Sequence, residues 1–431
     1  MTRTRILWGL LLMLIVSTGA ARVMAAPKEN FEKTVLKNGV TVMYKVMKDQ
    51  PMVSMYAVFP IGTRQEKAKG IAHLLEHLVF RGGSEYTYQD IAGETIRQGG
   101  QFNGFTSFYS TSYNYVVPKE NFETAFKVFN ASIWKTNLTA ANVDMEKKII
   151  VYELDMDYSM QYAYYPVIRY FYPEMYHSKE SMAGISVADL QAFHRSYYQP
   201  DNATYIIAGD FNPKTVFASL EQIKKTGESP KKTASALSGG LAFPRGEVVE
   251  ERNLYPFQFQ ALMGYELDGL TAKERMVLKL LSYIYGSNWK IDYRQNRYKI
   301  YNAVTRSVGN KDYFGIFYLE RVRPYSEARY RQEKENMQKF FHEFKKIDFK
   351  REFTNFSKLI DREMIQSQVS PETAVEYEVQ RLTDPDNITV DALEIVKSLK
   401  EKDLMDLIDK YFSKPPTAWI LVKHNAGGNN G

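Results

Sequence analysis

The residues best suited to chemistry are two histidines and a glutamate in the segment GIAHLLEHLVFRGG, residues 70–83. His73 and His77 are four residues apart, so on a helix both imidazoles leave the same face about one turn apart. Two neutral ring nitrogens at that spacing can hold one Zn²⁺. Glu76 projects toward the same face, where its carboxylate can take a proton from a metal-bound water. The H-x-x-E-H pattern predicts a hydrolytic zinc site with Glu76 as general base, against the alternative of two helix-face histidines that bind nothing.

A third protein ligand is expected, because a catalytic zinc usually has three protein ligands and one open position. The segment MEKKIIVYELDMDY, residues 145–158, places Glu146 and Glu153 seven residues apart. On a helix both carboxylates therefore lie on one face. Taken alone, either residue is as well explained by a solvated carboxylate stripe.

The pattern of apolar residues predicts the elements that position these groups. In the first half we expect strands over 34–36, 40–46, 53–60, 102–107, 112–117 and 203–209, and helices over 68–80 and 88–98. Asn38-Gly39 between the first two strands is a strong hairpin signal. After a stretch rich in Ser, Lys, Gly and Ala over 228–240, the same order returns. It comprises strands over 257–264, 301–308 and 313–320, a helix over 271–285, and helices from 326 to 412.

The two halves look like copies of one unit. Residues 187–210 align with residues 401–424 at a constant shift of 214, and the match falls at the end of each half. We therefore expect an α+β fold of two homologous domains, each a mainly antiparallel sheet backed by helices. At the same shift the counterparts of the two motif histidines are Ser287 and Ile291, so the second domain should have no zinc site of its own.

The amino terminus has the composition of a signal peptide. Two arginines precede an apolar run over 6–16, which is shorter than the roughly 20 residues that span a bilayer. Cleavage after Ala25 or Ala26 is expected, with a retained anchor as the alternative. We divide the chain into a signal peptide over 1–26, a zinc-binding domain over 27–227, a linker over 228–245, a homologous domain over 246–425 and a flexible tail over 426–431.

Composition excludes several classes of protein. The chain has no cysteine, which rules out thiol chemistry and a lipid-anchored lipoprotein and suits an oxidising space such as a periplasm. The formal net charge of +6 comes without a cluster of basic and aromatic residues, so nucleic acid is not an expected partner. No stable membrane span is expected once the signal is removed.

Taken together, these motifs resemble the pitrilysin family of zinc metallopeptidases, which use the inverted H-x-x-E-H motif and include insulin-degrading enzyme and the mitochondrial processing peptidase. In that family the third ligand is a Glu well downstream of the second His, and a supporting Glu precedes it by two helical turns. The intervals from His77 to Glu153 and from Glu146 to Glu153 match the family's spacings. The resemblance implies one Zn²⁺ per chain, held by His73, His77 and Glu153, with Glu146 supporting a ligand.

Two more segments carry the resemblance. QGGQFNGFTSFYSTSYNYVV, which begins at residue 98, looks like the family's strand pair beside the active site, whose edge strand accepts extended substrate by β-augmentation. This implies substrate contacts from Asn103, Phe105, Thr106 and Ser107. From the residues alone, Asn103 could equally be a plain turn residue.

In the second half, YRQNRYKIYNAV places Arg294 and Tyr301 seven residues apart, like the family's Arg/Tyr pair. That pair is implied to grip the substrate backbone and to stabilise the oxyanion. The chain departs from the family here, with Tyr298-Lys299 where relatives usually carry Gly-Leu, which leaves the placement of Tyr301 open.

The resemblance also implies an assembly, because the family builds its chamber from two double-domain halves and this chain supplies one. We expect a dimer in which Arg294 and Tyr301 complete the partner's zinc site, either a homodimer or a heterodimer with a related subunit. The expected activity is that of a zinc-dependent endopeptidase acting on peptides or unfolded polypeptides. The alternatives are a catalytically inactive structural or assembly subunit of the same fold and a zinc- or peptide-binding module without hydrolysis.

Overall fold

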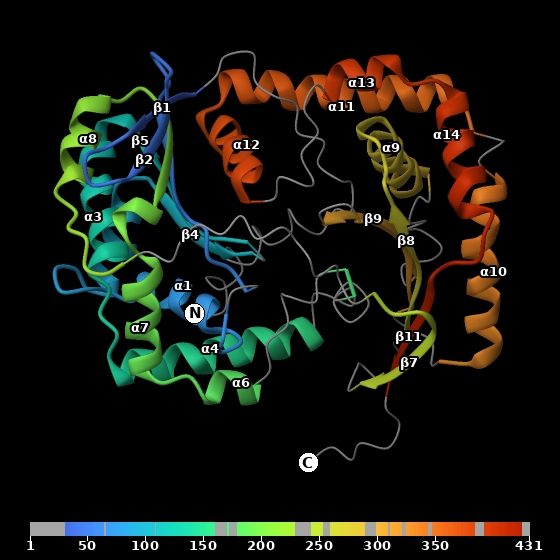
Figure 1. Cartoon of the computed structure of the whole chain (residues 1–431), viewed down its shortest axis with the longest axis horizontal. Helices are drawn as coiled ribbons and strands as arrows, with labels where there is room; N and C mark the ends of the chain where they lie inside the picture. The colour runs from blue at the N-terminus through green and yellow to red at the C-terminus, as the bar shows by residue number, and fades with distance from the viewer. Residues whose placement is uncertain are drawn as a thin grey trace, which may run out of the picture.

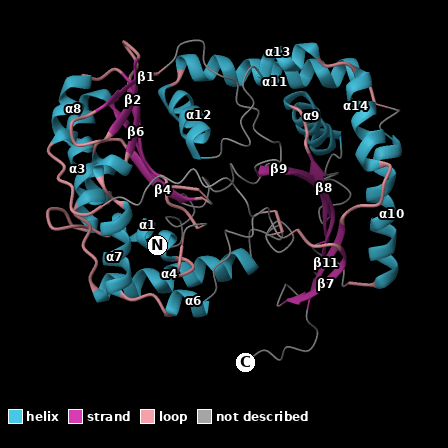
Figure 2. Ribbon diagram, in the orientation of Figure 1, coloured by secondary structure: helices cyan, strands magenta, loops and turns pink. Residues whose placement is uncertain are grey.

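The computed structural model describes residues 31–63, 66–107, 109–159, 170–171, 179–228, 243–252, 259–288, 299–308, 311–320, 325–343, 347–383 and 392–424. The predicted signal peptide and carboxyl-terminal tail lie outside these residues. Within them the molecule has two halves, each built around one sheet with helices on its outer side (Figures 1 and 2).

The first sheet has six strands in the order β1-β2-β6-β3-β5-β4, all antiparallel to their neighbours except the parallel pair β2 and β6. The strands are β1 (Glu32–Val35), β2 (Thr41–Val46), β3 (Met52–Phe59), β4 (Gln101–Thr106), β5 (Thr111–Pro118) and β6 (Thr204–Gly209). The predicted hairpin between β1 and β2 is confirmed. Gly39 in its turn has φ 95°, a left-handed conformation that glycine adopts without steric cost.

The helices of the first half pack on the outer face of this sheet or on one another. They are α1 (Ile71–Val79), α2 (Tyr88–Arg97), η2 (Lys119–Asn121), α3 (Phe122–Trp134), α4 (Ala140–Ser159), α6 (Lys179–Ala183), α7 (Val187–Tyr197), η4 (Pro200–Asn202) and α8 (Pro213–Glu221). Helix α1 buries Leu74, Leu75 and Leu78 in the main core of the first half. The opposite face of α1 lies against α4, so the two helices that carry the predicted zinc ligands are in contact.

The second sheet has five strands in the order β7-β11-β8-β10-β9, with β7 and β11 as its one parallel pair. The strands are β7 (Gly246–Arg252), β8 (Phe259–Asp268), β9 (Lys299–Val308), β10 (Lys311–Glu320) and β11 (Ala418–His424). This order repeats that of β2-β6-β3-β5-β4, including the position of the parallel pair. The prediction of two homologous α+β domains is therefore confirmed, although periodicity did not predict β7.

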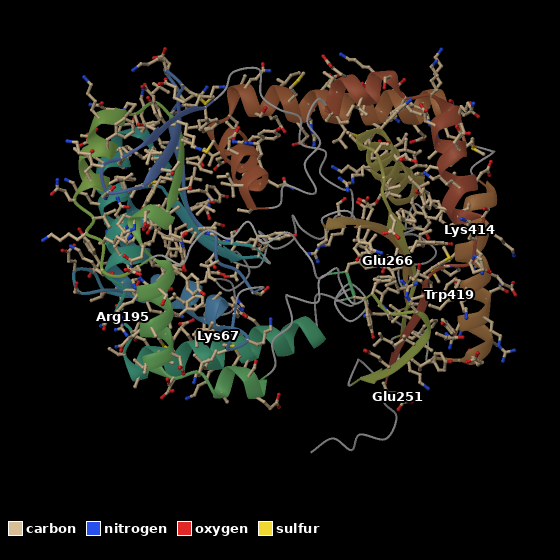
Figure 3. The ribbon with its side chains drawn as sticks, in the orientation of Figure 1. Lys67, Arg195, Glu251, Glu266, Lys414 and Trp419 are labelled. Atoms are coloured by element: carbon tan, nitrogen blue, oxygen red, sulfur yellow. The ribbon has the colours of Figure 1, made fainter. Side chains whose placement is uncertain are left out.

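The helices of the second half are α9 (Ala272–Asn288), α10 (Glu327–Glu343), α11 (Phe349–Val369), α12 (Pro371–Thr383), α13 (Ala392–Ser398), α14 (Glu401–Leu407) and η7 (Ile408–Phe412). Lys334 on α10 ties this helix to the sheet, because its ammonium group lies 4.9 Å from the centre of the Trp419 ring and 3.1 Å from Glu247. Figure 3 labels Trp419 on the side of the second half where α10 lies. The attraction between an ammonium group and an aromatic ring adds to the stabilisation that comes from burying the ring.

The end of each half shows the predicted shift of 214 in structural detail. Helices α7 and α14 begin at positions that this shift pairs with each other, and so do strands β6 and β11. Both helices are capped by an aspartate. The backbone N–H of Ser186 donates to Asp189 at 2.8 Å, and that of Lys400 donates to Asp403 at 2.8 Å.

The shift is not constant along the rest of the chain. Met55 in β3 and Ala261 in β8 pair with residues of β6 and β11 that are 214 apart, yet they are themselves only 206 apart. The expected pairing of the motif histidines with Ser287 and Ile291 is therefore wrong. The helix that follows β8, as α1 follows β3, is α9, and its sequence contains no histidine.

Helix α12 belongs to the second half of the sequence, between β10 and β11, but packs on the first sheet. It contacts β3 and β6, where Ala374, Val375 and Val379 are buried in one cluster with Val58 and Ile206. Figure 1 shows α12 on the side of the first sheet away from α3 and α8. The inner face of the first sheet is thus partly covered by the second half.

The reverse contact also exists. Phe171, from the first half of the sequence, is fully buried against the second sheet in a cluster with Leu262 and Phe317. Its ring lies so close to β10 that a Cβ atom at Gly315 would be 2.5 Å from it. Each half therefore contributes apolar side chains to the inner face of the other half's sheet.

The contact of α12 gives a stability prediction. Val375→Asp is expected to lower the free energy of unfolding by about 3–5 kcal/mol, because it places an unpaired carboxylate in a fully buried apolar cluster. Leu382→Asp, at a 40% exposed site on the same helix, should change it by less than about 0.5 kcal/mol. Urea unfolding of both variants tests this, and equal losses would contradict the buried role of α12.

Candidate metal centre

The start of helix α1 is fixed by a buried glutamate. The Glu66 carboxylate accepts the backbone N–H of Gly70 at 3.0 Å and that of Ala72 at 2.8 Å, and Gly70 has φ 93°. These bonds satisfy N–H groups that have no partner within the helix. Burial raises the pKa of Glu66, and the two backbone hydrogen bonds partly oppose this rise. The sequence predicted a helix that begins at residue 68 and did not predict this cap, whose signal is an acidic residue four positions before the N-cap residue Gly70.

The predicted zinc ligands come together between α1 and α4. The potential ligand atoms of His73, His77 and Glu153 all lie within 4.8 Å of one another. Oε2 of Glu153 is 3.5 Å from Nε2 of His77 and 3.9 Å from Nε2 of His73. The side chains of His73, His77 and Glu153 are 22%, 16% and 34% exposed, so all three are in partial contact with solvent.

Glu146 orients one of these ligands. Its Oε2 lies 2.8 Å from Nδ1 of His77, so that nitrogen is occupied and Nε2 is left facing Glu153. Burial lowers the pKa of His77, but its hydrogen bonds to Glu146 and Glu153 outweigh burial and raise the pKa to about 10. An imidazole held in this way keeps one ring orientation and becomes a more basic ligand.

A cation compensates the buried Glu146 carboxylate, which is 1% exposed. Arg81 forms an ion pair with its Oε1, and the guanidinium group lies 4.6 Å over the ring of Tyr88. Because a buried carboxylate is costly without a partner, the ion pair with Arg81 offsets the cost of burying Glu146 beside His77. Arg81 was not predicted from the sequence; it stands four residues after His77, just past the end of α1.

The donor set fits one zinc ion. Two imidazole nitrogens and one carboxylate oxygen form a ligand set that catalytic zinc sites use, and three protein ligands leave a position for water. The hydrogen bond at Nδ1 of His77 also selects Nε2 as its free donor atom. On these grounds the described residues fit a single Zn²⁺.

Glu76 lies beside this group and is 8% exposed. Its Oε2 accepts a hydrogen bond from Oγ1 of Thr106 at 2.6 Å. Burial raises the pKa of Glu76 to about 7, while the positive charge of His77 and the hydrogen bonds from Thr106 hold it back. A carboxyl group with a pKa near the working pH is suited to both accepting and donating a proton.

The substrate residues predicted on β4 divide between its two faces. Thr106 projects toward α1, whereas Asn103 and the half-exposed Phe105 lie at the alternate positions that project to the opposite face. Asn103 pairs with Asn114 within the strand, so its interpretation as a turn residue is wrong. Strand β4 is the edge strand of its sheet, as the prediction of β-augmentation requires.

The predicted carboxyl end of this strand needs correction, whereas substrate contact by Ser107 stays a prediction. The expected strand over 102–107 ends at Thr106, and Ser107 belongs to the turn that leads into β5. Its hydroxyl lies 3.0 Å from that of Ser110 and accepts the backbone N–H of Tyr109 at 3.2 Å. The Ser107 side chain therefore stabilises the turn.

The predicted Arg/Tyr pair lies in the second half. Arg294 is outside the described residues. Tyr301 is in β9, opposite Tyr318 of β10. Strand β9 is the edge strand of the second sheet, and in Figure 1 it lies on the side of its half that faces β4.

Comparison with known sequences identifies the family. The sequence model described as Insulinase (Peptidase family M16) matches residues 41–171, and the one described as Peptidase M16 inactive domain matches residues 184–352. The chain belongs to peptidase family M16. The first match contains the H-x-x-E-H motif, both α4 glutamates and β4, so the candidate centre lies in the insulinase part of the family.

Individual relatives are named as zinc proteases. The chain is 25% identical over 311 residues to the zinc protease PqqE of Helicobacter pylori, an alignment that covers 66% of this chain and 68% of that protein. It is also 25% identical over 431 residues to an uncharacterized zinc protease of Rickettsia bellii, covering 93% of this chain and 100% of the relative.

Solved structures share the M16 fold. A protease from Helicobacter pylori superposes with a TM-score of 0.71 at 20% identity, covering 92% of this chain and 99% of that one. The periplasmic protease PqqL from Escherichia coli gives a TM-score of 0.66 at 16% identity, covering 93% of this chain and 48% of that one. Among the described residues of this chain, no helix combines the length and the apolar character that crossing a bilayer requires.

The support of His77 gives a prediction at the centre itself. Glu146→Gln is expected to weaken zinc binding about 10- to 100-fold, because the amide cannot hold the imidazole by a charge-assisted bond. Asp144→Asn, an exposed position on the same helix, is the matched control and should bind zinc as the unaltered protein does. Competition titration with a chromogenic chelator measures both zinc affinities. Equal affinities of the two variants would show that Glu146 does not support zinc binding.

Proposed function

We propose that this chain is a zinc-dependent endopeptidase that hydrolyses peptides or unfolded polypeptides. The observation that carries the proposal is the meeting of His73, His77 and Glu153 beside a buried glutamate that is not part of the ligand group. Relatives named as zinc proteases support the same activity.

Each polar residue of the centre has a task in this reaction. A bound Zn²⁺ would lower the pKa of its water and polarise the scissile carbonyl. Glu76 accepts a proton from the attacking water and later delivers it to the leaving amine. Glu146, itself neutralised by Arg81, keeps the His77 ring in the orientation in which Nε2 can bind the ion.

The proposed substrate is an extended chain that pairs with the open edge of β4. Main-chain hydrogen bonds of this kind read the peptide backbone more than its sequence. Asn103 and Phe105, exposed on the face opposite α1, would then contact alternate side chains of the bound peptide. A short or unfolded chain can adopt the extended form that such pairing needs.

The proposed assembly is a dimer in which Arg294 and Tyr301 of one subunit complete the zinc site of the other, as a homodimer or with a related subunit. A mixture of Glu76→Gln and Tyr301→Phe subunits tests this. In a homodimer that exchanges freely, half of the dimers are mixed and each has one intact site, so about a quarter of the full activity should return. A fully active monomer on gel filtration would contradict the dimer.

Export to a periplasm is proposed from the amino-terminal sequence, with support from the periplasmic location stated for the Escherichia coli relative. Mass spectrometry of the protein recovered from cell fractions tests both the compartment and the cleavage after Ala25 or Ala26. Recovery of the uncleaved chain from the cytoplasm would contradict export.

The alternative is a catalytically inactive subunit of the same fold. It draws on one observation, the match of residues 184–352 to the M16 inactive domain. The two functions differ in a direct experiment. The purified chain is analysed for metal and incubated with an internally quenched fluorogenic peptide, with chelator and after zinc is restored. Chelator-sensitive cleavage supports the peptidase, whereas bound metal without cleavage supports the inactive subunit.

A further inference from the structure

The edge strand β4 touches the general base directly. We propose that Thr106 is a positioning residue that holds the Glu76 carboxylate in the orientation needed for proton transfer. Because Thr106 is part of β4, the strand with which a peptide would pair also fixes the orientation of the general base. The inference rests on the proposed peptidase function, which it deepens by linking substrate binding to proton transfer.

The first observation is the hydrogen bond between the two side chains. Oγ1 of Thr106 lies 2.6 Å from Oε2 of Glu76, within the range of hydroxyl bonds to a carboxylate. Such a bond is worth more than a neutral one because the acceptor is charged and largely removed from water. The bond restrains rotation of the Glu76 carboxylate. It uses Oε2, so the Thr106 hydroxyl does not bond to Oε1.

The second observation is that the backbone of β4 packs against Glu76 on the same face of the strand as Thr106. Gly104 is two residues before Thr106 and therefore projects to the same side of the strand. A Cβ atom at Gly104 would lie 2.7 Å from Cγ and 2.8 Å from Oε1 of Glu76. The backbone of β4 therefore lies against Glu76. The strand restrains this side chain both by the hydrogen bond from Thr106 and by steric contact at Gly104.

The backbone around Thr106 is held from its carboxyl side. The next residue, Ser107, donates its N–H to the carbonyl of Ser110 at 2.7 Å, and its own carbonyl accepts the N–H of Thr63 at 3.0 Å. The end of β4 is therefore tied both to its hairpin partner and to the loop that follows β3. Among the described strands, β4 has one neighbour in the sheet, β5, and a peptide would pair with its other edge.

These contacts predict how substrate and base are coupled. A peptide that pairs with the open edge of β4 adds a second neighbour to the strand and reduces its motion. Because Thr106 is part of that strand, the carboxylate is held most firmly when substrate is bound. Loss of the hydroxyl should therefore act on the chemical step more than on binding.

The kinetic test uses Thr106→Val and Thr106→Ser in the zinc-loaded full chain. Thr106→Val, which keeps the shape but not the hydroxyl, is expected to lower kcat about 10- to 100-fold, the value of a hydrogen bond to a charged group. The KM for the peptide should stay within about threefold and the zinc content should not change, while Thr106→Ser should restore most of kcat. In a Glu76→Gln background, Thr106→Val should cause little further loss.

A matched control is Thr354→Val on α11, where the hydroxyl bonds to the backbone carbonyl of Lys350 at 2.7 Å. This substitution makes the same chemical change at a position far in sequence from the metal centre, and it should leave kcat unchanged. A Thr106→Val variant that keeps the full kcat, or that loses it equally with and without Glu76, would overturn the proposal.

A second measurement needs no catalysis. In metal-free protein, Thr106→Val should lower the urea midpoint of unfolding when Glu76 is present and lower it less in a Glu76→Leu background, since the lost bond involves both partners. Equal shifts in the two backgrounds would overturn the inference even if the chain is an active peptidase. Conversely, a chain that never cleaves peptide but shows the coupling refutes the peptidase function while retaining the contact.

Discussion

A Glu76→Gln variant is expected to retain its zinc and to lose about 10²- to 10⁴-fold in kcat, the typical contribution of general acid–base catalysis. The amide has nearly the shape of the carboxylate and can still accept the hydroxyl of Thr106, so the surrounding structure should persist. It cannot accept a proton from water. Metal analysis and steady-state kinetics on a fluorogenic peptide measure the two quantities.

Glu123→Gln is the matched control for this experiment. Glu123 lies exposed in the first turn of α3 and does not belong to the group of potential metal ligands among the described residues. Its replacement should leave both zinc content and kcat unchanged. Cleavage by Glu76→Gln at the rate of the unaltered protein would show that another group takes the proton.

The second large effect is expected from the third ligand. Glu153→Ala should weaken zinc binding by more than about 100-fold, because residues that only support a ligand already contribute about 10- to 100-fold. Peptide cleavage should then depend on added zinc and fall to background at low metal concentration. The loss is chemical and not structural, since Glu153 is one-third exposed.

Tyr152→Ala provides the control from the neighbouring position. Tyr152 is 63% exposed on the same helix and is not among the predicted ligands. It should keep normal zinc affinity, and the two variants should unfold at similar urea concentrations. Full zinc occupancy of Glu153→Ala at low free metal would mean that the third ligand is elsewhere.

The sequence could predict the parts of the site that lie within one helix. His73, Glu76 and His77 are placed by helical periodicity alone, because residues three and four apart share a face. Glu153 belongs to a different helix far along the chain, and periodicity could show only that it shares a face with Glu146. Its assignment as a ligand came from the spacing seen in the family, and the structure brings its carboxylate to the two imidazoles.

Contacts between separate elements escaped prediction. The ion pair of Arg81 with Glu146 and the hydrogen bond of Thr106 to Glu76 each join two elements whose relative position depends on the whole fold. The cap formed by Glu66 depends on a loop that follows no period. Such contacts are fixed by tertiary packing, which a local pattern does not specify.

The sequence correctly predicted two copies of one unit, but the constant shift of 214 between equivalent residues was wrong for most of the chain. The segment between β3 and α1 spans residues 60–70, whereas that between β8 and α9 spans only residues 269–271. Connecting segments of different length change the numbering without changing the order of strands in the sheet. A constant shift therefore held only for the last helix and strand of each half.

Because α12 shields one side of the first sheet and Phe171 that of the second, the two copies share their apolar interiors. A polypeptide ending before α12 would present bare hydrophobic surface to water and should tend to aggregate. Calorimetry of the intact protein should then show one heat-absorption peak, with neither copy melting ahead of the other. The two copies are therefore expected to unfold as one cooperative unit.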